Sequence, residues 1–311
     1  MSTHHILVTG GAGFIGSHVC EALIAGGNRV TVIDDLSSGV RSNLPCHPRL
    51  TLQESDVLRF SPKYWPPGVD TIIHLSAIAS VAQSWNALKR AHEVNTSSTV
   101  HLLEVGRQLG ISRFVLASSA AVYGNPGSVP LAETAPLLPL SPYGLHKLVS
   151  EQYGLLLSQE TGITFVALRF FNVYGPRQLA ASPYSGVIAR FAEALRGGGP
   201  MTLRGDGRQT RDFVYVKDIA EAVVAATSID LPKGAFIPIN IGSGHATSIL
   251  ELGETMRTLS SESSVPIIFE SLAPGEIRES CADITRAQKA LGFVPRWNLR
   301  DGLEDLLNGS A

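Results

Sequence analysis

The chain has 311 residues, of which 44% are apolar, 17% charged and 7% aromatic, and its formal net charge is −2. The near-neutral charge and the lack of a basic tract argue against nucleic acid and anionic membranes as partners. The three cysteines, Cys20, Cys46 and Cys281, lack metal-ligand spacing and are typical of a reducing compartment. No signal peptide or spanning apolar run is predicted. We therefore expect a cytoplasmic protein without a metal site.

Strand-like and helical segments alternate through the first half of the chain. A helix is predicted from Phe14 to Ala25, where Gly26 and Gly27 follow as a stop signal. The other segments are strands at 5–9, 29–34, 71–77, 113–119 and 164–170 and helices around 84–108 and 142–160. This alternation indicates parallel pairing with right-handed crossovers. We expect an α/β fold with a Rossmann-type doubly wound parallel sheet over residues 1–170.

Glycine, proline and arginine become more frequent after about residue 171. We expect residues 171–311 to form mainly a smaller mixed α/β C-terminal lobe that binds the substrate. Segments near 210–242 should return to the first domain, with a helix around 217–227 and a strand near 237–242. Ser248 and Glu251 form a capping box that opens a helix to about Leu259.

A glycine-rich turn follows the first predicted strand. Gly10, Gly13 and Gly16 have GxxGxxG spacing and open a helix, as in sites that hold a pyrophosphate on a helix N-terminus. Asp34 closes the next strand 18 residues after Gly16, where a carboxylate can accept ribose hydroxyls. Asp35 adds a second negative charge that would repel a 2′-phosphate. The pattern therefore predicts NAD rather than NADP.

Tyr143 and Lys147 have the spacing that places both side chains on one helix face. A nearby positive charge stabilises a phenolate, so we expect the pKa of Tyr143 to be lowered by Lys147 and by an oxidised nicotinamide. Ser119 ends a predicted strand and can orient a substrate hydroxyl. Ser118 is its rival, and strand alternation allows only one of them to face the substrate. This set predicts proton and hydride transfer at a carbinol carbon.

Two further cofactor candidates have an ordinary structural alternative. Asp56, followed by Val57, could meet the adenine amine, although a simple loop carboxylate fits the spacing nearly as well. Asn95 fits a buried hydrogen-bonding residue at the cofactor site and, equally, a helix-kinking or solvent-facing asparagine.

Eight motifs occur in the order TGGAGFIGSH, DDLSSG, HLSAIASV, SSAAVYG, SPYGLHK, RFFNVYGPRQ, RDFVYVKDIA and INIGSG. In these the chain resembles the extended short-chain dehydrogenases/reductases of the nucleotide-sugar epimerase/dehydratase group, and most of all the UDP-hexose 4-epimerases. The resemblance covers essentially the whole chain. It implies a UDP-sugar substrate, a redox-neutral reaction with tightly held NAD, and a homodimer built on the helices near 84–108 and 142–160.

The resemblance also implies roles for individual residues. The cofactor set comprises Gly10, Gly13, Phe14 and Ile15 at the pyrophosphate, Asp34, Asp35, Ser37, Ser38 and Gly39 at the adenosine ribose, Asp56 and Val57 at the adenine, Leu75 and Ala77 beneath the cofactor, and Phe170 near the nicotinamide. The substrate set comprises Asn172, Arg211 and Arg278 at the diphosphate, Val187 at the base and Glu276 at the ribose. Spacing alone would make Arg211 and Arg278 ordinary surface arginines.

Two departures separate the subfamilies. The 4,6-dehydratases of this group carry acidic and polar residues where this chain has Ala120 and Ala121, so dehydration is disfavoured. The position of Ser280 gates the sugar pocket in the family, and its small side chain leaves room for a 2-N-acetyl group. We expect a 4-epimerase acting on UDP-GlcNAc and UDP-GalNAc, and on UDP-Glc and UDP-Gal. The rivals are a nucleotide-sugar reductase or decarboxylase and a non-catalytic NAD-binding scaffold.

Overall fold

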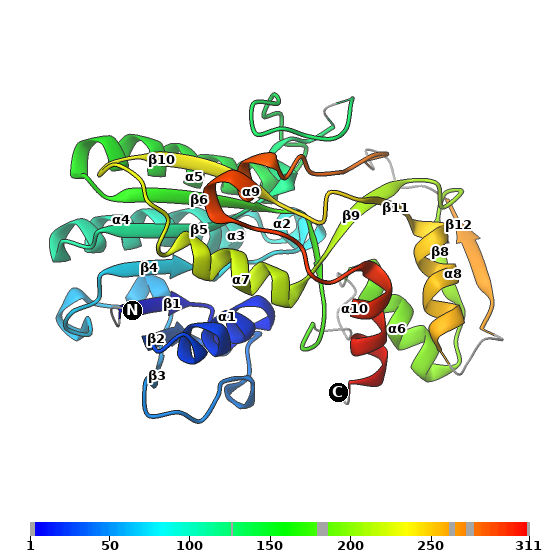
Figure 1. The fold of residues 1–311 in the computed structure, drawn as a ribbon, viewed down its shortest axis with the longest axis horizontal. Helices are drawn as coiled ribbons and strands as arrows, with labels where there is room; N and C mark the ends of the chain where they lie inside the picture. Colours follow the sequence, from blue (N-terminus) through cyan, green and yellow to red (C-terminus); the bar gives the residue numbers. More distant parts are fainter. Residues whose placement is uncertain (1–3, 126, 179–185, 261–264, 272–276, 310–311) are drawn as a thin grey trace.

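The computed structural model describes residues 4–125, 127–178, 186–260, 265–271 and 277–309 (Figure 1). Its centre is a seven-stranded sheet in the order β10-β6-β5-β4-β1-β2-β3, and every adjacent pair is parallel. The strands are β1 (His5–Thr9), β2 (Arg29–Asp34), β3 (Leu50–Glu54), β4 (Thr71–His74), β5 (Arg113–Ser119), β6 (Thr164–Phe170) and β10 (Phe236–Ile241). The strand order reverses between β1 and β4, and open α/β sheets bind their ligands in the crevice outside the carboxyl ends of the strands at such a point. The predicted doubly wound α/β fold is confirmed.

Helices cover both faces of this sheet. One face carries α1 (Phe14–Ala25), α7 (Val216–Ala226) and α9 (Thr285–Leu291), and the other carries α4 (Ser98–Leu109) and α5 (Pro142–Thr161). Alternation along β1 sends Val8 into the first of these cores and Leu7 into the second. Strands buried on both faces need continuous apolar runs, which is why the inner strands β1, β4, β5 and β6 are so apolar.

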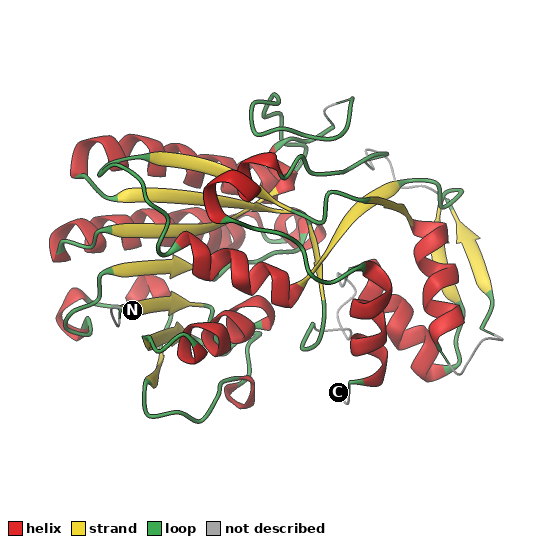
Figure 2. Cartoon of the chain, in the orientation of Figure 1, coloured by secondary structure: helices red, strands yellow, loops and turns green. Residues whose placement is uncertain are grey.

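The smaller lobe lies beyond the carboxyl ends of the strands (Figure 2). It holds a two-stranded sheet, β8 (Met201–Arg204) and β12 (Ile267–Glu270), with α6 (Val187–Gly197), α8 (Ile249–Leu259) and α10 (Leu299–Asn308). A second small sheet has the order β11-β9-β7, formed by β11 (Ala246–Ser248), β9 (Thr210–Tyr215) and β7 (Asn172–Tyr174). None of the described helices is both long and apolar enough to cross a membrane.

The structure differs from the predicted elements in three places. The helix expected around 84–108 consists of α2 (Val81–Asn86), α3 (Leu88–His92), a π-helical turn at Glu93–Ser97, and α4. The strand expected at 71–77 ends at His74, and residues 75–80 form an irregular loop after it. Leu50–Glu54, for which no strand was predicted, forms the edge strand β3. Short 3₁₀ turns lie at Arg41–Asn43, Val57–Arg59, Pro62–Tyr64 and Ala120–Val122.

Candidate active site

The glycine-rich turn brings backbone close to backbone at the end of β1. Gly10 has a φ of +70°, and a Cβ there would lie 2.8 Å from the Ser76 nitrogen. A Cβ on Gly16 would lie 2.1 Å from the Gly10 carbonyl oxygen. Helix α1 begins after Gly13 with no side-chain cap and no acidic residue in its first turn, at Phe14 and Ile15. The free amide groups of that turn fit the pyrophosphate of a dinucleotide.

Two carboxylates lie at the carboxyl end of β2. Asp34 is buried, and its oxygens accept hydrogen bonds of 2.9 Å from the Ala12 and Leu36 amides. Burial raises the pKa of Asp34, and these two bonds act to lower it. Asp35 accepts bonds from the amide and hydroxyl of Ser37. A carboxylate has about four lone-pair positions, so both residues keep acceptor capacity for ribose hydroxyls.

The loops after β2, β3 and β4 complete the cofactor side of the site. A Cβ on Gly39 would lie 2.8 Å from the Ala12 carbonyl carbon, so only glycine lets this loop approach the glycine-rich turn. Asp56 caps the 3₁₀ turn at Val57 by accepting from the Leu58 amide at 3.0 Å. Its carboxylate therefore has a structural role in the loop, which was the alternative to a contact with the adenine. Ser38, Leu75 and Ala77 lie in these same loops.

Asn95 lies in the π-helical turn and is 1% exposed. Its Oδ1 accepts a 2.7 Å bond from the Ile78 amide, and its Nδ2 donates a 3.1 Å bond to the Ile78 carbonyl. The side chain therefore fixes the segment that follows β4, and a direct contact with the cofactor stays a prediction.

Ser119, Tyr143 and Lys147 meet at the carboxyl edge of the sheet. Ser119 ends β5, and its hydroxyl lies close enough to that of Tyr143 to act on the tyrosine pKa. Tyr143 follows Ser141, whose hydroxyl caps α5 by accepting from the Gly144 amide. The Lys147 Nζ lies 5.9 Å from the centre of the Tyr143 ring. The structure thus brings the predicted serine, tyrosine and lysine together, with Phe170 buried at the end of the neighbouring strand β6.

The pKa of Tyr143 in the chain alone differs from the expectation. Burial raises the pKa of Tyr143 in the chain itself, and Ser119 only partly offsets this rise. The chain alone therefore does not show the lowering expected from Lys147, because desolvation of the phenolate is the largest effect; the lowering by Lys147 together with an oxidised nicotinamide stays a prediction. Burial lowers the pKa of Lys147 to about 8, against the opposing charge of Glu151, so the lysine is mostly protonated at neutral pH.

A buried polar network lies behind the site and decides between the two serines. Ser118 donates a 2.5 Å bond to Glu151, which forms a 2.7 Å ion pair with Arg169. Arg169 also donates to Tyr123, and Tyr123 donates to Asn240. Ser118 thus faces this network while Ser119 faces Tyr143, as strand alternation requires. The network was not predicted from the sequence, although Glu151 follows Lys147 by one helical turn.

His74 forms a second buried relay that sequence analysis missed. Its Nδ1 lies 2.7 Å from the Thr9 hydroxyl, and its Nε2 lies 3.0 Å from the Ser98 hydroxyl. Ser98 donates its own proton to the Val94 carbonyl, so His74 is a neutral imidazole with the proton on Nε2. Thr9 in turn accepts from the Ser76 amide. The relay therefore ties β1, β4 and α4 together beneath the crevice.

This relay predicts acid-sensitive stability. Burial lowers the pKa of His74 to about 3, against about 6.5 in an unfolded chain. Between these values the unfolded chain binds more protons, so the free energy of unfolding falls as the pH falls below 6.5. We expect His74 to account for about 2 kcal/mol of the loss between pH 7.5 and pH 5.0. Urea unfolding of His74→Gln should show a pH dependence smaller by that amount, whereas the exposed His245→Gln should match the wild type. An equal dependence in His74→Gln would contradict the assignment.

The substrate candidates lie where the smaller lobe meets the sheet. Arg211 lies in β9, and the amide of the preceding Thr210 donates a 2.8 Å bond to the Arg278 carbonyl, so the two arginines come from adjacent backbone segments. Asn172 is exposed at the start of β7, and Val187 begins α6 half-buried. Glu276 lies outside the described residues.

Asp212 organises this region, and the sequence analysis did not single it out. It is fully buried and accepts bonds from the amides of Ser243, Gly244 and Ala282 at 2.6 to 3.0 Å. The bond to Ala282 fixes the backbone two residues after Ser280, which is 8% exposed. The available signal was a carboxylate directly before the apolar run that ends β9.

Comparison with known proteins agrees with this geometry. A model of the NAD dependent epimerase/dehydratase family matches residues 6–242. The putative UDP-glucose 4-epimerase of Methanocaldococcus jannaschii is 36% identical over 306 residues, with 97% of each chain covered. The solved UDP-N-acetylglucosamine 4-epimerase of Methanobrevibacter ruminantium is 36% identical, with a TM-score of 0.93 and coverage of 99% and 98%.

A third relative carries the cofactor. The UDP-glucuronic acid 4-epimerase of Bacillus cereus, solved with UDP-glucuronic acid and NAD, is 33% identical, with a TM-score of 0.90 and 98% of each chain covered. The cofactor of this chain is accordingly NAD, which the uncapped α1 terminus and the carboxylates of β2 fit. The chain belongs to the NAD-dependent epimerase/dehydratase family.

Proposed function

We propose that the protein inverts C4 of a UDP-sugar, with UDP-GlcNAc and UDP-GalNAc as the preferred pair and UDP-Glc and UDP-Gal as the second. This proposal rests on the assembly of Ser119, Tyr143 and Lys147. Ala120 and Ala121 follow Ser119 directly in the chain. The assembly can move a proton at a sugar hydroxyl. The two alanines cannot supply the acid and base that dehydration needs.

The residues divide the chemistry among them. Tyr143 takes the proton of the 4-hydroxyl and returns it after the ring has turned over, and Ser119, which lies beside the tyrosine, orients the oxygen. NAD, when bound, accepts the C4 hydrogen as hydride and gives it back to the other face. Burial raises the pKa of Tyr143, so formation of the phenolate needs positive charge beside it. Lys147, whose Nζ lies 5.9 Å from the centre of the tyrosine ring, would supply part of that charge, and the oxidised nicotinamide of bound NAD would supply the rest. Remote contacts to the diphosphate, for which Asn172, Arg211 and Arg278 are the candidates, keep the 4-ketose bound.

An NMR assay with the purified protein and no added cofactor tests the function. UDP-GlcNAc and UDP-Glc are supplied separately, and the anomeric signals of the 4-epimers are followed. We expect UDP-GalNAc to appear. Stoichiometric consumption or formation of NADH would instead indicate the reductase alternative. Loss of the carboxyl group from UDP-glucuronic acid, supplied in a separate sample, would indicate the decarboxylase. Conversion of no sugar, even with NAD supplied, would contradict the proposal and favour a scaffold role.

Ser280 is proposed to set the sugar preference. Its side chain is small and buried, and its backbone cannot retreat because Asp212 holds the Ala282 amide at 3.0 Å. Ser280→Tyr should abolish turnover of UDP-GlcNAc and UDP-GalNAc and spare UDP-Gal, measured as kcat/KM for each pair. Glu279→Tyr adds the same ring at the exposed neighbouring position and should leave the ratio unchanged. An equal loss for both sugar pairs would show that Ser280 is not the gate.

The expected homodimer has support in the same helices. Four large apolar side chains on α2, α3 and α5 are at least half exposed: Trp85 (58%), Leu88 (53%), Leu145 (50%) and Leu156 (65%). Apolar side chains in such number on one helical layer are typical of a covered face. Sedimentation equilibrium would test this proposal.

A further inference from the structure

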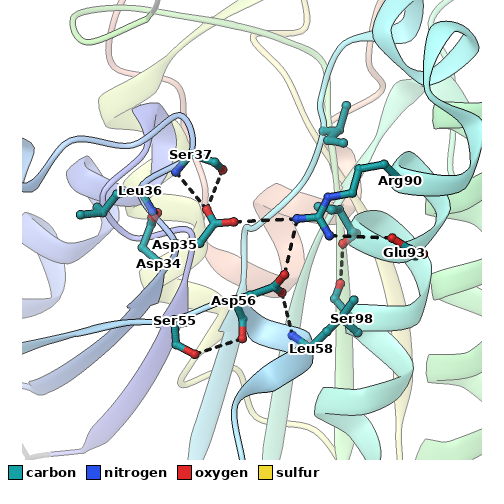
Figure 3. Close-up of polar contacts among 12 residues, drawn as sticks. Asp34, Asp35, Leu36, Ser37, Ser55, Asp56, Leu58, Arg90, Glu93 and Ser98 are labelled. Carbon is teal, nitrogen blue, oxygen red and sulfur yellow. Dashed lines mark hydrogen bonds and ion pairs between the residues drawn. The ribbon is translucent and has the colours of Figure 1, made fainter.

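One arginine reaches across the adenosine end of the proposed NAD site. Arg90 lies in the short helix α3, and its Nη2 is 3.5 Å from the Asp56 Oδ2 and 3.9 Å from the Asp35 Oδ2 (Figure 3). Asp35 follows β2 and Asp56 follows β3, so this guanidinium joins the ends of two strands to the helical layer beside them. Its Nη1 also lies 3.8 Å from Glu93 on the same helical segment.

The ion pairs of Arg90 with Asp35 and Asp56 are weak and reversible, because all three side chains are partly exposed to solvent. The Arg90 side chain is 47% exposed, and those of Asp35 and Asp56 are 35% and 25% exposed. Exposed ion pairs at such distances are screened by water and salt. Glu93 gives the guanidinium a third partner away from the two strand ends. Arg90 can therefore leave the bridge without becoming an unpaired charge.

Among the described residues, Arg90 is the cation paired with both Asp35 and Asp56. The other cation nearby, Arg41, pairs at 3.0 Å with Glu54. Without Arg90 the ends of β2 and β3 would present uncompensated carboxylates to a cofactor that is itself anionic. The bridge thus offsets a repulsion at the place where ribose and adenine are expected.

We propose that Arg90 is a latch, meaning that its pairing with Asp35 and Asp56 closes the adenosine end of the site and slows the release of NAD. The proposal rests on the proposed placement of adenosine between Asp34, Asp35 and Asp56. Arg90 acts as a positioning residue through these carboxylates. A latch suits an enzyme whose reaction leaves its cofactor unchanged, because no exchange of NAD is needed between turnovers.

The test measures release of the cofactor rather than turnover. Protein loaded with isotopically labelled NAD is chased with excess unlabelled NAD, and the label that stays bound is followed in time. Arg90→Met should release NAD about two- to fivefold faster, the size expected for exposed ion pairs, since the loss of contacts in one site appears mainly in the dissociation rate. The release rate of Arg90→Lys should lie between those of the wild type and Arg90→Met, because an ammonium is a point charge that engages one carboxylate at a time. Added salt should speed release from the wild type more than from Arg90→Met.

Lys89→Met is the matched control. It removes the same charge from the neighbouring residue of α3, and Lys89 has no ion pair with the described part of the chain. An unchanged release rate in Arg90→Met, or an equal acceleration in Lys89→Met, would overturn the latch. A wild type that binds no labelled NAD would overturn it together with the placement of the cofactor. A wild type that retains NAD slowly but converts no sugar would contradict the proposed function and leave the latch standing.

Discussion

Tyr143→Phe is expected to lower kcat roughly 10²–10⁴-fold or more, because it removes the group proposed to exchange a proton with the sugar. The loss should be confined to chemistry. The Tyr143 amide donates a 3.1 Å bond to the Ser84 hydroxyl, and Ser141 caps the helix, so the backbone stays in place. Binding of UDP, measured by calorimetry, should therefore survive.

The control for this change lies ten residues along the same helix. Tyr153 is 41% exposed on α5, so Tyr153→Phe removes a hydroxyl of the same kind away from the crevice. Its kcat should equal that of the wild type. A rate near the wild-type value in Tyr143→Phe would remove this tyrosine from the mechanism.

Glu151→Gln should cost about 3–5 kcal/mol of unfolding free energy, because it leaves the charge of Arg169 buried without compensation. Both side chains of the pair are at most 3% exposed, and Arg169 donates to both carboxylate oxygens, at 3.0 and 2.7 Å. Urea unfolding at neutral pH measures the change. Glu160→Gln, at an exposed position of the same helix, should stay within about 0.5 kcal/mol of the wild type.

A double variant separates the charge from the packing. In Glu151→Leu with Arg169→Met neither charge remains, and such apolar replacements of buried pairs are often neutral. This double variant should be more stable than Glu151→Gln. If the single and double variants lost equal stability, the cost would come from packing and not from the orphaned arginine.

The buried parallel strands were the part of the fold that the sequence predicted best. Their apolar runs have one structural interpretation, the buried strand. Strands β1, β2, β5 and β6 have the predicted bounds. β3 was missed because an edge strand needs apolar residues on one side only, and LTLQE is half polar. The break in the helix around 84–108 was invisible to periodicity, since a single π-helical turn shifts the pattern by one residue.

The site divides in the same way. Motifs that follow strands could be placed from the sequence, because the carboxyl ends of parallel strands share one edge. The side chains that hold those motifs in place could not be predicted from the sequence. Glu151 with Arg169, His74 with Thr9, and Asp212 with Ala282 join residues that are 18, 65 and 70 positions apart. Their partners depend on the tertiary fold.

The path of the chain between its two lobes constrains how such an enzyme can change. After β6 the chain enters the smaller lobe, returns with α7 and β10 to the main sheet, leaves for β11 and α8, comes back with α9, and ends in α10 of the smaller lobe (Figure 1). No single cut separates the lobes. The smaller lobe, which is proposed to bind the substrate, therefore cannot be transplanted between relatives as one contiguous segment, and a change in sugar preference would have to arise within an interwoven scaffold.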